Sequence, residues 1–331
     1  MEPELFIKGA LQGDSVVLQG VLQSLWSGYG QIARYQVKRG SESFSVILKS
    51  INWRDIQAHP RGWQSDLSHQ RKVTSYKVEN HWYQHWSQLC DERDRVAKRL
   101  GSWEKEETLY LLLEDLDEAG FSRRMGQLSL EQVTTVLHWL ACFHGRFLTL
   151  EVSQDWPEGL WPRGTYWHLS TRPNEWQAMA DSPSKEAASA LDHALASATY
   201  QTLVHGDAKV ANFCFSEDAQ AVAAVDFQYV GRGIGSQDVA YFLGSCLSEQ
   251  LLAEYLDYLL DVYFSELSRC IVARGESPDL AESVAQEWYR LFPVAWADFH
   301  RFILGWSPTH HKNTHFSERL AQKGVDYLRC K

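Results

Sequence analysis

Residues 203–243 read LVHGDAKVANFCFSEDAQAVAAVDFQYVGRGIGSQDVAYFL. Two short apolar runs enclose a polar segment between residues 213 and 225, and this pattern predicts a β-hairpin. Asp207 lies before the hairpin, Asn212 at its start, and Asp226 directly after it. The stretch therefore places two carboxylates and one amide around a single turn of the chain.

These residue types suit phosphoryl transfer. One carboxylate must orient the attacking hydroxyl or accept its proton, while a second carboxylate and an amide oxygen must hold Mg²⁺ against the phosphates of ATP. The spacing H-x-D-x-x-x-x-N from His205 to Asn212 fits that chemistry, and Asp226-Phe227 takes the place of a metal-binding D-F pair. The alternative is a solvated loop with unrelated acids, which does not account for the order of the set.

The same residues carry a family resemblance. HGDxxxxN, with Gly206 after the histidine, resembles the aminoglycoside phosphotransferase and choline kinase superfamily, whereas protein kinases carry Arg there. The run from Val225 to Gln228, VDFQ, is similar to the ecdysteroid-kinase-like family of small-molecule kinases within that superfamily. The resemblance covers about residues 15–250 and is sharpest in residues 203–243.

This resemblance implies an α+β, two-lobed, protein-kinase-like fold. We expect a small antiparallel-sheet N-lobe over residues 1–115 and a mainly helical C-lobe over residues 116–331, with a hinge near residues 109–116. In this reading the N-lobe holds ATP, and the C-lobe holds the catalytic loop, the metal site and the acceptor pocket.

Composition limits the possible partners. The chain has 331 residues, of which 44% are hydrophobic and 22% charged, values typical of a globular protein. A net charge of −10 disfavours nucleic acid as a partner. No signal-peptide pattern and no apolar run of about 18 residues is present, so no membrane span is expected. The six scattered cysteines indicate free thiols in the cytoplasm and argue against zinc.

The N-terminal third reads as strands. Residues 16–26, 31–38 and 43–51 predict a three-strand antiparallel meander. Gly28 and Gly30 lie in its first turn, where their backbone N–H groups could contact ATP phosphates, although an ordinary hairpin turn explains them equally well.

The third strand ends in a lysine, and its pleat places Ile47 and Lys49 on one face. The resemblance assigns Lys49 to the α- and β-phosphates, with Ile47 against adenine. It assigns Glu79, in a helix predicted over residues 71–89, to an ion pair that orients Lys49. In the same family, backbone groups of the hinge, here Glu114 to Leu116, hold the adenine edge.

Other segments yield coarser expectations. Residues 52–70 predict a loop that folds over the nucleotide or the acceptor, and residues 91–105 a helix end and a turn. Residues 231–235 predict a glycine-rich turn, and residues 280–290 and 293–306 two separate helices. The fourteen tryptophans indicate either packing or an aromatic pocket for a flat or cationic acceptor.

The predicted reaction is Mg-dependent transfer of phosphate from ATP to a hydroxyl of a small molecule. Asp207 acts on the hydroxyl, Lys209 contacts the transferring phosphate, and Asn212 and Asp226 hold Mg²⁺. His205 and Asp238 support the loop, the latter by hydrogen bonds to its backbone. A steroid-like or other lipophilic alcohol is the expected acceptor, and choline, ethanolamine or aminoglycoside kinases are alternatives. A non-catalytic kinase-fold binding protein and a nucleotidyl transferase are alternatives of other classes. The pattern identifies neither the acceptor nor the oligomeric state.

Overall fold

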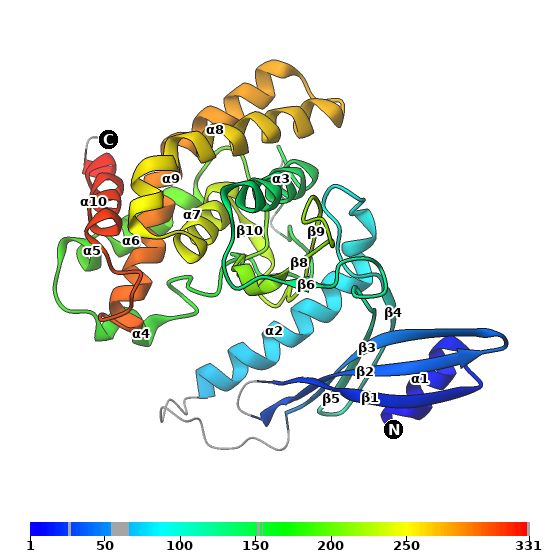
Figure 1. The fold of residues 1–331 in the computed structure, drawn as a ribbon. Helices are drawn as coiled ribbons and strands as arrows, with labels where there is room; N and C mark the ends of the chain where they lie inside the picture. The colour runs from blue at the N-terminus through cyan, green and yellow to red at the C-terminus, as the bar shows by residue number, and fades with distance from the viewer. Residues whose placement is uncertain (26–27, 54–65, 151–152, 154, 330–331) are drawn as a thin grey trace.

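A five-stranded antiparallel sheet forms the N-terminal part of the computed structural model, which describes residues 1–25, 28–53, 66–150, 153 and 155–329 (Figure 1). Its strand order is β1-β2-β3-β5-β4. The sheet and its covering helix comprise α1 (Pro3–Leu11), β1 (Ser15–Ser24), β2 (Gly30–Arg39), β3 (Glu42–Asn52), β4 (Arg99–Lys105) and β5 (Thr108–Glu114). The predicted meander is confirmed as β1, β2 and β3.

The pleat of β3 separates two environments. Val46 and Leu48 pack with Phe6 and Ile7 of α1 in a core on one face of the sheet. Lys49 lies on the opposite face, toward α2 (Asp66–His85), which lies between the sheet and the helical part (Figure 1). This alternation places Lys49 on the face of the strand that is turned toward α2.

Strand β4 corrects the prediction of a helix end and a turn for residues 91–105, which is wrong for residues 99–105. The strand lies at the sheet edge and carries a bulge between Arg99 and Gly101. Because an edge strand with a bulge buries few side chains in strict alternation, its sequence lacks a period of two. Of the predicted 52–70 loop, residues 54–65 lie outside the described residues, and the prediction is wrong for residues 66–70, which form the first turn of α2.

The remainder of the chain is mainly helical, which confirms the α+β class. Its helices are α3 (Leu130–Arg146), α4 (Pro173–Ala178), α5 (Pro183–Glu186), α6 (Ala188–Ala196), α7 (Gly235–Cys246), α8 (Glu249–Ala273), α9 (Pro278–Trp306) and α10 (His315–Arg329). None of the helices in the described ranges is both long and apolar enough to cross a bilayer. The division into lobes near residue 116 stays a prediction.

Helix α9 corrects the prediction of two helices separated at Pro293, because it continues through that residue. Proline removes one backbone hydrogen bond from a helix interior. The half that follows Pro293 is nearly all buried against α7, α4 and α10, so tertiary packing outweighs the local cost.

Short strands frame the stretch that holds Asp207, Asn212 and Asp226. The predicted hairpin is confirmed as β8 (Phe213–Phe215) and β9 (Val222–Ala224), joined at one edge by β6 (Arg123–Arg124). The glycine-rich turn predicted at residues 231–235 is instead strand β10 (Gly231–Gly233), which pairs with β7 (Thr202–Val204). Glycine is needed in this strand, because a Cβ on Gly231 would lie only 2.3 Å from the carbonyl oxygen of Trp161.

An aromatic cluster connects the two parts of the chain. Phe227 stacks on Trp82 of α2 with ring centroids 4.6 Å apart, and it also contacts Trp139 and Phe143 of α3. All four side chains are buried. The residue after Asp226 is thus anchored in the core, which fixes the position of its neighbour.

Candidate active site

The loop between β7 and β8 presents Asp207 with both carboxylate oxygens occupied. Its Oδ1 accepts a hydrogen bond from the Tyr241 hydroxyl at 3.1 Å. Its Oδ2 accepts from the Lys209 ammonium at 2.8 Å and from Asn212 Nδ2 at 3.2 Å. These three hydrogen bonds fix the orientation of the carboxylate, so it suits positioning a hydroxyl.

The backbone of this loop is held from α7. Asp238 accepts the N–H groups of His205 at 2.5 Å and Gly206 at 2.9 Å. His144 of α3 contacts the same carboxylate at 3.1 Å, and its other ring nitrogen lies 2.8 Å from the Tyr263 hydroxyl. Since all these groups are buried, three helices fix the loop through hydrogen bonds.

His205 and Gly206 have distinct structural tasks. His205 Nδ1 accepts the N–H of Asp207 at 3.2 Å and Nε2 lies 3.0 Å from the Val225 carbonyl, so the ring is the Nε2–H tautomer. Gly206 has φ +79°, and a Cβ there would lie 2.2 Å from the Tyr229 carbonyl oxygen. This close approach explains glycine where protein kinases carry arginine.

Asn212 and Asp226 lie side by side, because the Asn212 carbonyl accepts the N–H of Val225 at 3.0 Å. The Asn212 side chain donates its Nδ2 to Asp207, which leaves Oδ1 without a hydrogen bond among the described residues. Asp226 Oδ2 is likewise without one in that part of the chain. An amide oxygen and a carboxylate oxygen, both unengaged, form the kind of oxygen donor set that Mg²⁺ takes.

Lys49 reaches this pair from the sheet. Its Nζ lies 2.6 Å from Glu79 Oε2 and 3.7 Å from Asp226 Oδ1. Burial alone would lower the pKa of Lys49, but the two carboxylates outweigh burial and raise the pKa above its usual value. Conversely, burial would raise the pKa of Asp226, yet Lys49, Lys209 and Lys72 together hold that pKa below its usual range. The site is a balanced cluster of charges.

Gln228 and Lys72 extend this cluster. Gln228 Nε2 donates to Asp226 Oδ1 at 2.6 Å, while its Oε1 accepts from Lys72 Nζ at 2.7 Å and from Ser75 Oγ at 3.2 Å. Burial lowers the pKa of Lys72 to about 8. The sequence analysis missed Lys72, although its place seven residues before Glu79 puts it on the same helix face.

The turn with Gly28 and Gly30 lies next to this cluster through Tyr29, whose ring is 5.8 Å from Tyr76 of α2. The N–H of Gly28 donates to the Leu25 carbonyl at 3.2 Å. Gly30 has φ +142°, and a Cβ there would lie 1.9 Å from the Ser50 carbonyl oxygen. The close pairing of β2 with β3 therefore explains why residue 30 is glycine. The Gly28 N–H is already occupied by its hydrogen bond within the turn.

The predicted adenine residues occupy the end of β5 and the facing strand. Ile47 is half-buried on the same face as Lys49. The Glu114 carboxylate pairs with Arg95 and with the N–H of Lys98, so no side-chain role is left for it. The Leu116 carbonyl accepts from Phe121, but its N–H makes no hydrogen bond within the described residues. A free backbone N–H at this place is what an adenine edge would use.

Lys209 and Tyr241 contact Asp207 directly, and Lys312 lies over the ring of Tyr241. Besides its contact with Asp207, Lys209 has a pKa that burial would lower but that Asp207 and Asp226 raise overall. The Lys312 ammonium lies 5.1 Å from the centre of the Tyr241 ring and 5.4 Å from that of Phe299. Neither Tyr241 nor Lys312 was predicted, because both reach the site from distant segments without a local sequence signal.

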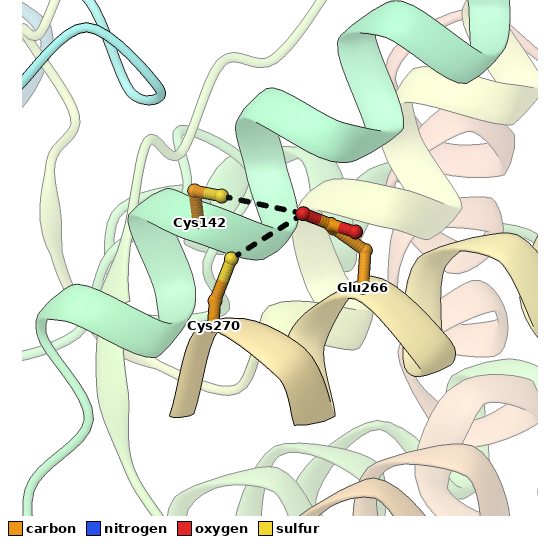
Figure 2. Close-up of side chains that lie close together, drawn as sticks. All are labelled: Cys142, Glu266 and Cys270. Carbon is orange, nitrogen blue, oxygen red and sulfur yellow. Dashed lines mark hydrogen bonds between the residues drawn. The ribbon is translucent and has the colours of Figure 1, made fainter. Parts of the chain in front are cut away.

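One cysteine-containing cluster lies elsewhere, between α3 and α8. Cys142 and Cys270 donate to Glu266 Oε1 at sulfur–oxygen distances of 3.8 and 3.6 Å (Figure 2). Across the described chain this is the one group of three or more His, Cys, Asp or Glu side chains close enough together to hold a metal ion. It offers three ligands, one short of a closed tetrahedral site, and it shares no residue with the Asp207 cluster.

Comparisons with known proteins bear on the class. The model of the ecdysteroid kinase-like family matches residues 165–274, a stretch that holds Asp207, Asn212 and Asp226. The resemblance to that family is confirmed over this stretch. No curated protein matches the chain.

Several solved kinases are similar in structure at low identity. A microcompartment-associated aminopropanol kinase shares 15% identity with a TM-score of 0.46, covering 98% of this chain and 94% of that one. An ethanolamine kinase from Plasmodium vivax shares 12% identity with a TM-score of 0.45, covering 96% of this chain and 83% of that one. An aminoglycoside phosphotransferase from Streptomyces rimosus shares 12% identity with a TM-score of 0.45, covering 87% of this chain and 97% of that one. At such values none of their substrates is carried over to this chain.

Proposed function

We propose that the protein is a Mg-dependent ATP phosphotransferase that phosphorylates a hydroxyl group of a small molecule. The observation that carries this proposal is the convergence of Asp207, Asn212, Asp226 and Lys49, from the sheet and from the helical part, into one cluster. The family match over residues 165–274 supports the same class.

In this proposal the acceptor oxygen attacks the γ-phosphorus while the bond to the β–γ bridging oxygen breaks and ADP leaves. Asp207 orients the hydroxyl and takes its proton late, since the transition state is loose. Lys49 contacts the α- and β-phosphates, and Lys209 contacts the transferring group. Asn212 Oδ1 and Asp226 would hold Mg²⁺, which when bound neutralises charge on the phosphate oxygens.

Binding of the base is proposed at the end of β5, through the free N–H of Leu116 and the apolar face of Ile47. In this proposal the short turn at Gly28 and Gly30 covers the nucleotide but makes little contact with its phosphates. We also propose a cytoplasmic location, where ATP is abundant and free thiols such as Cys142 and Cys270 stay reduced.

The direct test is ADP release with Mg-ATP across a panel of alcohols, amino alcohols and hydroxy acids. Changing Asp207→Asn should lower kcat by about 10²- to 10⁴-fold, while Mg-ATP still raises the melting temperature. Full turnover in Asp207→Asn would contradict the mechanism. Release of pyrophosphate in place of ADP would indicate nucleotidyl transfer, and a lack of both product and thermal shift would indicate a binding protein.

A further inference from the structure

The segment between α9 and α10 places one cation beside the catalytic aspartate. Lys312 lies over the rings of Tyr241 and Phe299, and the Tyr241 hydroxyl donates directly to Asp207 Oδ1. Lys312 is therefore separated from Asp207 by a single aromatic side chain. Asp207 Oδ2 accepts instead from Lys209 and Asn212, so Lys312 is connected to Asp207 through Tyr241 and Oδ1.

The charge of Lys312 is not balanced by the protein. Its ammonium makes no hydrogen bond and no ion pair with any residue that the structure describes, and its contacts are the two aromatic rings. Asp207, the nearest acid along this network, is already paired with Lys209 at 2.8 Å. A partly buried cation without a counter-ion is costly unless a ligand supplies the missing charge.

The aromatic faces near Asp207 are also taken. Arg172 lies over Tyr166 and Phe302, at 5.6 and 5.5 Å from the ring centres, just as Lys312 lies over Tyr241 and Phe299. These are the faces that would otherwise bind the ammonium of a cationic substrate. Such a substrate would find these faces covered by two cations, of which Arg172 is paired with Glu175 at 3.1 Å and Lys312 is unpaired within the described residues.

We propose that Lys312 binds an anionic group, a carboxylate or a phosphate ester, on the hydroxyl-bearing acceptor. The inference rests on the proposed kinase function and specifies the acceptor class for it. It disfavours choline, ethanolamine and aminoglycosides. The aromatic side chains form the wall that places the anion, while Asp207 receives the hydroxyl of the same molecule.

The pH dependence of KM distinguishes a lysine that binds the acceptor from one with only a structural role. Burial lowers the pKa of Lys312 to about 8, although Asp207 acts in the opposite direction. The other titratable groups that face it are Tyr241, Lys209, Cys246 of α7 and His310 of its own segment. Below about pH 8 the ammonium is charged, so KM for a carboxylate acceptor should be constant there and rise above it. Because burial also lowers the pKa of Lys72 to about 8, the rise is assigned to Lys312 only if Lys312→Met abolishes it.

The experiment uses four probes with one glyceryl skeleton: glycerate, its neutral amide, aminopropanediol and glycerol phosphate. Binding to the Mg-ADP complex is measured by calorimetry, and ADP release is measured with Mg-ATP. Glycerate or glycerol phosphate should bind at least about tenfold more tightly than the amide and the amine, as expected for a charge-assisted contact. Which of the two binds better distinguishes a carboxylate from a phosphate site.

Three variants test whether Lys312 causes the preference for anionic probes. Lys312→Met should abolish the preference, Lys312→Arg should keep most of it, and Lys323→Met, which removes an exposed lysine of α10, should leave it unchanged. The proposal is overturned if no probe binds, if aminopropanediol binds as well as glycerate, or if Lys312→Met raises KM for Mg-ATP instead. Anion preference without ADP release from any probe would refute the kinase function alone and leave the anion site standing.

Discussion

Gln228 occupies the place where the metal-binding motif of many kinases has glycine, and here its amide bridges two elements. One end donates to Asp226 and the other accepts from Lys72 and Ser75 of α2. Asp226 has φ +69°, a conformation that an L-residue adopts only when its surroundings hold it there. We infer that Gln228 is one of the contacts that hold it.

Changing Gln228→Leu should therefore weaken the metal site. The variant removes a charge-assisted hydrogen bond from Asp226 and leaves Lys72 without its acceptor, and each such loss is worth about 1.5–3 kcal/mol. We expect kcat to fall about tenfold and the Mg²⁺ concentration for half-maximal rate to rise. Steady-state kinetics at varied Mg²⁺ measures both.

The matched control is Gln322→Leu, the same exchange at an exposed position of α10. It should retain the parent kinetics. If Gln228→Leu and Gln322→Leu behaved alike, Gln228 would have no role in placing Asp226.

At the scale of elements, α2 is the part that connects the sheet to the catalytic region. Lys72, Ser75, Tyr76 and Glu79 follow one another at helical spacing along one face of α2. Glu79 pairs with β3 while Lys72 and Ser75 contact Gln228, so a single helix face touches both halves of the site. A displacement of α2 would change the nucleotide side and the metal side together.

Helices α9 and α10 cross closely at Gly324. A Cβ on Gly324 would lie 2.2 Å from the carbonyl oxygen of Pro293, so Gly324→Ala must separate the two helices. We expect a loss of about 1–3 kcal/mol in the free energy of unfolding, as for other overpacked sites. Urea unfolding measures it, with Gly126→Ala as control because a Cβ there meets nothing within 4 Å.

Equal stability of Gly324→Ala and Gly126→Ala would show that the contact at Pro293 is relaxed without cost. Since α10 follows the segment with Lys312, a loosened α10 should also weaken binding of the anionic probe.

At the scale of the whole molecule, the site differs in charge from the rest. The chain carries a net charge of −10, yet Lys49, Lys72, Lys209 and Lys312 gather around two aspartates and one glutamate. Cations concentrated at one place in an acidic protein attract anionic ligands to that place. ATP and an anionic acceptor both fit such a distribution.

Removal of Mg²⁺ tests the site as a whole. With EDTA, turnover should be lost, and ATP should stabilise the protein less because Asp207 and Asp226 then face the phosphates without a counter-charge. At about 100 times its Kd, Mg-ATP should add about 2.7 kcal/mol to the free energy of unfolding. Thermal or urea unfolding with and without EDTA measures the difference, and an identical stabilisation by ATP alone would contradict the assignment of Asn212 and Asp226.

The sequence predicts a contact well when the residues that meet are close together in the chain, and poorly when they are far apart. The short spacing from His205 to Asp226 already determines that Asp207, Asn212 and Asp226 meet at one hairpin, so local reasoning was enough for them. Strand β4 and the course of α9 through Pro293 depend on packing against other elements, which no local pattern encodes. Lys72 and Lys312 meet partners at Gln228 and Tyr241, far away in the chain, and for that reason were missed.

The pairing of β10 with β7 has a consequence for how such an enzyme is controlled. Only residues 228–234 separate Phe227 from α7, and Gly231–Gly233 are bound into a strand. A covalent mark on an inserted loop, the usual switch of signalling kinases, has no segment to act on at this place.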